Sequence, residues 1–318
     1  MLALAGGVGA ARFLVGAVDV VDPARVTAIV NTGDDVMLHG LHISPDLDTV
    51  MYTLAAAVNP ETGWGLTGET WRVMEALERF APARPSDSMA GMTWFRLGDQ
   101  DLGTHLYRTQ RLREGAPLSV VTAELTSAWG VGVCLLPMTD DAVETRMVVA
   151  GEGEIGFQDY FVARAHSVAV DGVRFAGAGA SRPAPGVVES IEAAETVVIC
   201  PSNPIVSIGP ILAVPGIIEA VTRRREATVA VSPIVAGAAL KGPAARLMSE
   251  LGHEPSVVGV ARIYAPVAAT LVIDAADDAL APAVEAEGMR CVVAPTVMHT
   301  PAVAAALART VLSTAARR

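Results

Sequence analysis

Lysine is almost missing from this 318-residue sequence, in which Lys241 is the single lysine among 23 basic residues. Arginine in its place, with abundant alanine and valine, is typical of a high-GC bacterial genome. A lone ammonium group kept in that background is a candidate for chemistry that arginine does not supply, and a chance surface lysine is the alternative.

Aromatic residues, cysteine and positive charge are also scarce. Aromatics make up 4% of the chain against 52% hydrophobic residues, so aliphatic side chains must fill the core. The net charge of −11 argues against binding to nucleic-acid backbone. The six histidines show no metal-binding spacing, and Cys134, Cys200 and Cys291 lie far apart in apolar runs. We expect reduced thiols in the core.

Long apolar runs are lacking too. No stretch of about 18 apolar residues is free of charges and breakers, which argues against a membrane span. Leu2–Ala5 runs directly into glycines, without the basic start and apolar stretch of a secretory signal. We therefore expect a cytoplasmic protein with no membrane partner.

The chain opens with the pattern of a right-handed βαβ unit. Leu2–Ala5 is a short apolar strand that ends on glycines, Ala10–Val18 has helical character, and Val26–Val30 is a second β-rich run. Ser44 and Pro45 then have the residue types of an N-cap and a first helical residue.

Residues 60–130 form a mostly helical segment by their hydrophobic spacing. Glu69–Phe80 is amphipathic, and Asp99–Glu114 and Ser119–Trp129 each end at a glycine. Strand and helix candidates alternate from residue 131 onward. We predict an α/β fold, a Rossmann-like, doubly wound and mostly parallel sheet made by residues 1–59 and 131–318, with a helical insertion lobe at 60–130.

The first candidate site is a glycine loop between the first strand and helix. Gly6, Gly7 and Gly9 let the backbone approach a phosphate at a helix N-terminus. Arg12 stands where a dinucleotide fingerprint has its third glycine, and the second strand ends in Asn31 rather than an acid. Both features disfavour an NAD enzyme. A turn chosen for packing remains the alternative.

Four aspartates follow the second strand within fifteen residues: Asp34, Asp35, Asp46 and Asp48. Such carboxylates repel one another unless a cation offsets them, and Mg2+ that also binds substrate phosphates is the natural partner. Asp46 and Asp48 lie in the first turn of a predicted helix, where simple complementarity to the helix dipole is the alternative.

Two further loops follow apolar strands. Cys200–Pro210 is stiffened by proline and carries Asn203 and Ser207, which suit a nucleotide, although a capped connection is the alternative. The next loop starts at Ser232 and leads to Lys241 just before a predicted helix, which favours a phosphate-binding role for the lysine.

The predicted lobe contains a mixed aromatic and charged segment, Trp94–Asp101. Trp94, Arg96 and Asp99 could hold a planar polar ring by stacking and hydrogen bonds. A buried lobe interface, with Asp99 as an N-cap, is the competing interpretation.

Taken together, these motifs resemble the 2-phospho-L-lactate transferase family, whose high-GC bacterial members are phosphoenolpyruvate transferases of coenzyme F420 biosynthesis. Nearly the whole chain is covered, and the Ser-Pro-Asp-x-Asp-Thr and Ser-Asn-Pro-x-x-Ser-Ile-Gly-Pro blocks are the specific ones. The matching segments are Gly6–Ala10, Asn31–Asp35, Ser44–Thr49, Trp94–Asp101, Cys200–Leu212 and Ser232–Lys241.

The resemblance implies a homodimer that binds a guanosine diphosphate-linked donor in its core. The ribityl hydroxyl of the deazaflavin Fo attacks the phosphorus that bears a three-carbon acid, and GMP leaves. The position of Asp48 contacts Fo in the family, and Arg96 is the candidate for a second contact. The glycine loop with Arg12, then Asn203, Ser207 and Ser232–Lys241, correspond to the nucleotide site.

The carboxylates also predict a catalytic role, in which Asp35 or Asp48 orients or deprotonates the acceptor alcohol. The acid transferred, phosphoenolpyruvyl or 2-phospholactyl, is left open, with the high-GC composition favouring the former. The main rival is a regulatory protein of the same fold that binds a nucleotide-sugar without turnover. The segment Trp94–Asp101 argues against it, because such a binder needs no deazaflavin site.

Overall fold

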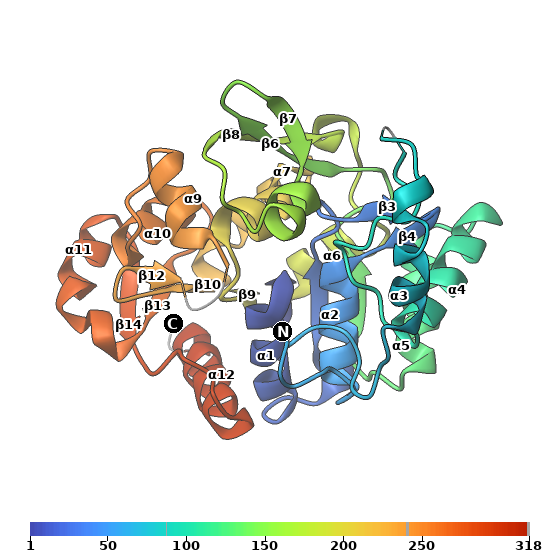
Figure 1. The fold of residues 1–318 in the computed structure, drawn as a ribbon. Coiled ribbons are helices and arrows are strands. Elements are labelled where there is room, and N and C mark those ends of the chain that lie inside the picture. Colours follow the sequence, from blue (N-terminus) through green and yellow to red (C-terminus); the bar gives the residue numbers. More distant parts are fainter. Residues whose placement is uncertain (87, 240–241, 317–318) are drawn as a thin grey trace.

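A computed structural model describes residues 1–86, 88–239 and 242–316. Its centre is a seven-stranded sheet in which every pair of neighbours is parallel (Figure 1). The order across the sheet is β14-β13-β10-β9-β1-β2-β5. The strands are β1 (Leu2–Ala5), β2 (Thr27–Val30), β5 (Cys134–Pro137), β9 (Val197–Ile199), β10 (Thr228–Val231), β13 (Thr270–Ile273) and β14 (Arg290–Val293). The Rossmann-like, doubly wound sheet predicted from the sequence is confirmed.

The five inner strands, β13, β10, β9, β1 and β2, are buried on both faces, which explains their nearly continuous apolar sequences. In β1, Leu2 and Leu4 belong to one hydrophobic cluster, whereas Ala3 and Ala5 belong to another on the opposite face. This alternation follows from the two-residue period of a strand.

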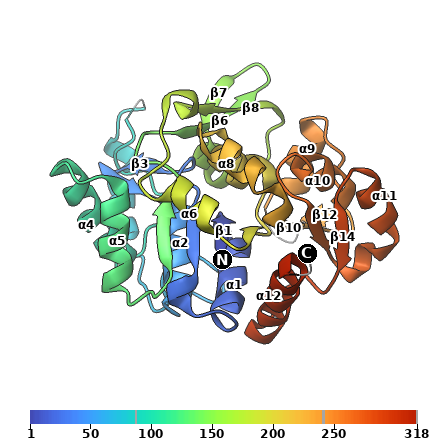
Figure 2. The ribbon, with the colours of Figure 1, turned by 180° about the vertical axis from the view of Figure 1, so that it is seen from behind.

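Helices cover both faces of the sheet (Figure 2). One layer holds α1 (Gly7–Val18), α2 (Pro45–Leu54), α5 (Leu118–Ala128) and α12 (Pro301–Ala316). The other layer holds α6 (Val187–Ala193), α7 (Gly209–Ala213), α8 (Ile217–Arg223), α9 (Ala244–Glu250), α10 (Val257–Tyr264) and α11 (Ala281–Ala286). Short helical turns occur at Pro23–Arg25, Ala81–Ala83, Asp159–Ala163, Ala178–Ala180, Pro204–Ile208, Arg225–Ala227 and Ala275–Leu280.

The predicted lobe is less helical than its sequence indicates. α3 (Arg72–Glu78) is short, and the rest of residues 55–98 is largely irregular. α4 (Asp101–Arg113) flanks the site described below. α5, at the end of the predicted lobe, packs on β5 with Val121 and Leu125 in the core cluster of α1, so it contributes to the core layer rather than to an independent lobe.

Three small antiparallel sheets were not predicted. β6 (Glu144–Val149) pairs with β7 (Gly153–Gly156) and β8 (Val170–Ala176), and this sheet stands above the central one in Figure 1. The other two are the hairpins β3 (Val36–Leu38) with β4 (Leu41–Ile43), and β11 (Ile234–Val235) with β12 (Ala238–Ala239). They are made by short or weakly apolar segments, so neighbouring segments rather than propensity select the strand conformation.

Cys134 corrects one expectation from the sequence, because it is exposed at the start of the outer strand β5 and is not a core residue. Cys200 is buried, and Cys291 is half-buried.

No single described helix is long and apolar enough to cross a membrane. One pair, Pro204–Ala213 and Ile217–Arg223, bent by 97°, passes the same length and composition criteria.

Candidate functional site

A cavity of about 690 Å³ lies at the carboxyl ends of the strands. Its floor is the point where β1 and β9 lie side by side while their connections lead to opposite halves of the sheet. Open α/β sheets bind ligands at such a switch point. The predicted site residues that line the cavity are Gly6, Gly7, Gly9, Arg12, Asp34, Asp46, Asp48, Arg96, Asn203, Ser207 and Ser232.

The glycine loop is clamped against the loop that follows β9. A side chain at Gly9 would place its Cβ 2.2 Å from the carbonyl oxygen of Pro201, which no residue but glycine tolerates. At Gly6 a Cβ would lie 2.7 Å from Ser207 Cβ. Ser202 Oγ donates to the Gly6 carbonyl at 2.8 Å and accepts from the Gly6 amide at 3.3 Å. Packing alone therefore accounts for part of the glycine pattern.

Asn203 and Ser232 have structural partners in addition to their place in the cavity wall. Asn203 Oδ1 accepts from the amides of Ile205 at 2.9 Å and Val206 at 3.3 Å, and so caps a helical turn. Ser232 Oγ accepts from the Ile234 amide at 3.1 Å and donates to the same residue's carbonyl at 3.0 Å. Their nucleotide-binding role stays a prediction.

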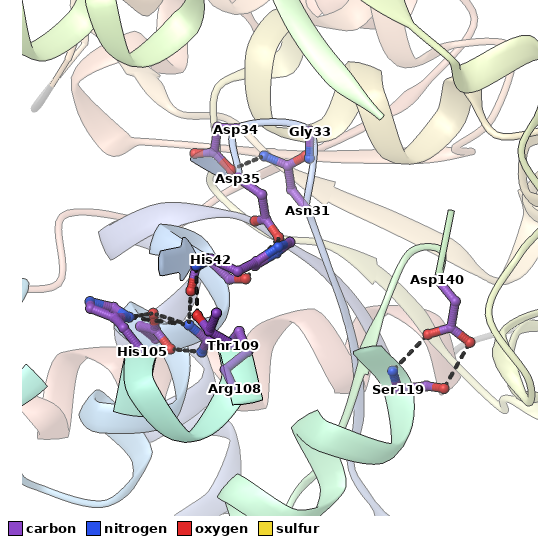
Figure 3. A network of polar contacts seen from close by, with 12 residues as sticks. Asn31, Gly33, Asp34, Asp35, His42, His105, Arg108, Thr109, Ser119 and Asp140 are labelled. Carbon is purple, nitrogen blue, oxygen red and sulfur yellow. Dashed lines mark hydrogen bonds and ion pairs between the residues drawn. The ribbon is translucent and has the colours of Figure 1, made fainter. Parts of the chain in front are cut away.

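Asn31 joins two of the four aspartates. Its Nδ2 donates to Asp34 Oδ1 at 3.1 Å and to Asp46 Oδ2 at 3.0 Å, while its Oδ1 accepts from the Gly33 amide at 2.8 Å (Figure 3 shows Asn31 beside Asp34). Asn31 thus takes the place of the ribose-binding acid of a dinucleotide enzyme and holds carboxylates instead.

The carboxylates of Asp34 and Asp46 are both buried, and their pKa values indicate that a nearby positive charge would stabilise them. Burial raises the pKa of Asp46 to about 7. The hydrogen bonds from Asn31 and from the Gly7 amide lower it, but they are weaker than the effect of burial. Burial and the nearby charges of Asp46 and Asp35 raise the pKa of Asp34. Burial disfavours the charged form of both carboxylates. A hard divalent cation at the cavity wall would offset that effect, because it binds carboxylate oxygens.

Asp35 corrects the predicted arrangement, because it points away from the cavity. Its Oδ2 accepts from Ser44 Oγ at 2.7 Å and lies 2.9 Å from His42 Nε2 (Figure 3). Burial raises the pKa of Asp35, and the contacts with His42 and Ser44 oppose that effect. In this position Asp35 supports the β3–β4 hairpin and is not part of the cavity lining.

Asp48 lines the cavity and is bound from behind by Arg108 of α4. Arg108 Nη1 donates to Asp48 Oδ2 at 3.1 Å, and Nη2 pairs with Oδ1. The two side chains are 2% and 7% exposed, so the pair is a buried, bidentate ion pair. Although burial disfavours the charge of Arg108, Asp48 and Asp35 raise its pKa. Asp48 is therefore held in one orientation toward the cavity.

The four aspartates consequently do not surround one cation. No three of them bring ligand atoms within 4.8 Å of one another; the group of three that does so among the described residues is Asp48, Asp101 and His105. Because Arg108 already compensates Asp48, Asp34 and Asp46 are the carboxylates with uncompensated charge that could hold a cation.

Tyr52, which the sequence did not indicate, lines the cavity together with Asp101, the last residue of the segment Trp94–Asp101, and His105. Tyr52 Oη donates to Asp101 Oδ1 at 2.6 Å, and His105 Nε2 lies 3.1 Å from Asp101 Oδ2. Burial opposes the charge of Asp101, but the contacts with His105, Tyr52 and Arg108 together lower its pKa. Tyr52 follows Asp48 by four residues in α2, and His105 follows Asp101 by four residues in α4. This helical spacing could have indicated that each pair shares one face of its helix.

The segment Trp94–Asp101 reaches the cavity in part. Arg96 and Phe95 line it, and the Arg96 guanidinium lies 5.0 Å from the centre of the Trp71 ring. Trp94 packs edge-on against Phe95 and is not part of the lining. Asp99 accepts from the amide and hydroxyl of Thr70 at 2.8 and 2.9 Å, so it joins two loops rather than facing the cavity. Trp94 and Asp99 are therefore not part of the cavity wall, which corrects their predicted position.

Lys241 lies outside the described residues.

The remaining cavity wall contains residues that the sequence did not indicate, from the irregular segment 59–66, from the turn after β7 and from the segment after β14: Thr62, Trp64, Phe157, Gln158, Phe161, Thr296, Val297, Met298 and His299. Gln158 Nε2 donates to the Asp34 carbonyl at 3.0 Å, which ties the turn after β7 to the loop that carries Asp34.

Sequence comparison identifies the family. A model of the 2-phospho-L-lactate transferase family, CofD, matches residues 1–300. The chain belongs to this family. Its relatives include phosphoenolpyruvate transferases from Streptomyces griseus (44% identical, over 99% of this chain and 98% of theirs) and Nocardia farcinica (46%, over 86% and 82%). The protein of the same name from Mycolicibacterium smegmatis is 39% identical over 96% and 95% of the two chains.

Solved structures support the fold of this CofD-family protein. Two crystal structures of a protein from Bacillus halodurans, described as a member of the upf0052 family, each cover 98% of both chains. Their TM-scores are 0.60 and 0.59, at 16% and 14% identity. At that identity the likeness shows the fold alone.

Proposed function

We propose that the protein transfers a phosphoenolpyruvyl group from a guanosine diphosphate-linked donor to the deazaflavin Fo, with release of GMP and formation of dehydro coenzyme F420-0. One observation carries the proposal: the family that transfers such acids matches almost the whole chain, and the matched blocks converge on one cavity. The 2-phospholactyl group is the alternative cargo.

The donor's diphosphate fits the centre of the cavity. There the glycine loop exposes backbone at the start of α1, which is 12 residues long, and Asp34 and Asp46 are ready to bind Mg2+. Mg2+ would offset the charge of the diphosphate and of the departing GMP. Asp34 and Asp46 are the proposed ligands, with water and phosphate oxygens for the other positions.

The acceptor fits the side of the cavity that faces α4. Trp64, Phe95 and Arg96 offer aromatic and cationic surfaces for a planar ring, and Asp48 offers a fixed carboxylate for a hydroxyl. In the proposed reaction the Fo hydroxyl attacks the phosphorus that bears the acid. Its proton passes to Asp48, and the bond from phosphorus to the GMP oxygen breaks. Asp48, and not Asp35, is the proposed base because Asp35 faces away from the cavity.

The test is an assay of the purified protein with Fo, Mg2+ and each candidate guanosine donor, with products identified by mass spectrometry. We expect product with the phosphoenolpyruvyl donor and less than about one tenth of that rate with Asp48→Asn, since loss of a positioned base costs roughly 100-fold or more. Near-normal turnover by Asp48→Asn would exclude Asp48 as the base.

The rival, a regulatory protein that binds a nucleotide-sugar, predicts no Fo binding. Fluorescence titration with Fo in the presence of Mg2+ and GDP separates the two. Saturable binding that Arg96→Leu weakens supports the transferase, and no binding supports the rival. We also propose a cytoplasmic homodimer, to be checked by light scattering and cell fractionation.

A further inference from the structure

The segment between β14 and α12 forms a wall of the cavity that no motif indicated. We call Thr296–His299 the C-terminal strap. β14 is the outermost strand on its side of the sheet, whereas α12 packs against α1 at the centre (Figures 1 and 2). The strap must therefore run along the carboxyl edge of the sheet, and all four of its residues line the cavity.

The strap is anchored rather than loose. Asp274, which follows β13, accepts from the Thr296 amide at 2.7 Å and from the Thr296 hydroxyl at 3.1 Å. Its other oxygen accepts from the Ala276 amide at 3.0 Å. Burial opposes the charge of Asp274, but these hydrogen bonds lower its pKa. A fixed carboxylate thus holds the strap against the edge of the sheet.

Arg12 lies on the same side of the cavity. Gly16, one turn after Arg12, is where α1 meets α12, since a Cβ there would lie 2.2 Å from the carbonyl carbon of Ala304. His299 lies just before α12 begins, so α1 and α12 bring Arg12 and His299 to one wall. Arg12 is exposed, and no hydrogen bond or ion pair joins it to another described residue.

Charge is divided between the two sides of the glycine loop. The carboxylates of the cavity, Asp34, Asp46, Asp48 and Asp101, come from the loop after β2, from α2 and from α4. The strap side has a guanidinium and an imidazole, with no described carboxylate in its lining. An anionic group far from the acceptor is the ligand that this distribution suits.

We propose that Arg12 and the strap bind the nucleotide end of the donor, with the Arg12 guanidinium on the phosphate that leaves with the nucleoside and His299 as a second hydrogen-bonding group. This inference rests on the proposed function. A guanidinium binds phosphate through two parallel hydrogen bonds and stays charged, and an exposed imidazole can donate to phosphate or ribose oxygens. Arg12 then stabilises the leaving nucleotide while Asp48 acts on the attacking alcohol at the other end.

Two variants with matched controls test the proposal. Arg12→Ala and His299→Ala are compared with Arg290→Ala, an exposed arginine at the opposite end of β14, and with His253→Ala, an exposed histidine after α9. Calorimetry with GDP and Mg2+ gives the dissociation constant, and steady-state assays give KM for the donor and for Fo separately.

We expect Arg12→Ala to weaken GDP binding and raise the donor KM about 10- to 100-fold, the loss of one hydrogen-bonded charge. His299→Ala should cost about 3- to 10-fold, the loss of one neutral hydrogen bond. KM for Fo should stay within about twofold, since these residues face away from the acceptor. Arg12→Lys should recover only part of the loss, because it keeps the charge without the planar fork.

Three results would overturn the inference: GDP affinity within about threefold of wild type in Arg12→Ala, a rise of KM for Fo instead of for the donor, or an equal loss in Arg290→Ala. The last would mean that general charge, not a site, attracts the nucleotide. A wild-type protein that neither binds GDP nor uses a guanosine donor would instead refute the proposed function.

Discussion

Replacing Arg108 by methionine should destabilise the protein more than any exposed arginine substitution does. Arg108 and Asp48 are 2% and 7% exposed and are joined by two hydrogen bonds. Methionine fills much of the same volume but leaves Asp48 charged, buried and without its partner. Removing one member of a buried pair costs about 3–5 kcal/mol. We therefore expect the free energy of unfolding to fall by about that amount at pH 7.

Urea unfolding followed by circular dichroism measures the change, and two further variants show its cause. Arg111→Met on the same helix removes partly exposed pairs with Glu114 and Glu124, which solvent screens, so it should lower the stability far less than Arg108→Met does. The double variant Arg108→Met with Asp48→Asn should be more stable than Arg108→Met alone, because it no longer contains the buried, unpaired carboxylate of Asp48. A loss under about 1 kcal/mol for Arg108→Met, or a double variant less stable than the single, would refute the reasoning.

Three further predictions follow from the site. Because burial raises the pKa of Asp46 from 3.8 to about 7, its folded state binds a proton more tightly than the unfolded chain, so stability should fall as pH rises from about 4 through 7. Mg2+ should restore that loss, raising the melting temperature more at pH 8 than at pH 5, and Asp46→Asn should abolish the difference. Gly9→Ala should cost about 1–3 kcal/mol through its clash with Pro201, whereas Gly103→Ala, with open space around it inside α4, should be neutral or slightly stabilising in the same thermal melts. Tyr52→Phe, which removes the donor to the partly buried carboxylate of Asp101, should cost about 1–3 kcal/mol in urea unfolding, and unchanged stability would contradict the assigned hydrogen bond.

Local sequence was sufficient for the parallel core. Leu2–Ala5 and Thr27–Val30 are strands within the predicted bounds, because short aliphatic runs between glycine turns and amphipathic helices have few other conformations. The same reasoning indicated a strand at Arg146–Val149, which lies within β6, but it failed for β7 and β8. Val170–Ala176 is only partly buried and alternates weakly, so contact with β6 rather than its own pattern determines the strand.

The site was predictable in position but not in side-chain direction. Asp34 and Asp35 are adjacent, yet one bonds to Asn31 in the cavity wall and the other to Ser44 behind it. Local sequence cannot predict the direction of two adjacent aspartate side chains, because each direction depends on hydrogen-bond partners that only the folded chain brings near. The pairing of Arg108 with Asp48 was not predictable for a similar reason, since the two residues lie 60 positions apart in the sequence.

The most direct test of the account is the identity and amount of the nucleotide released during turnover. Wild-type protein is incubated with Fo, Mg2+ and the phosphoenolpyruvyl guanosine donor, and nucleotide and deazaflavin products are quantified together by liquid chromatography and mass spectrometry. Attack on the phosphorus that bears the acid predicts GMP equal in amount to dehydro coenzyme F420-0. Release of GDP, or GMP without the deazaflavin product, would contradict the proposed transfer.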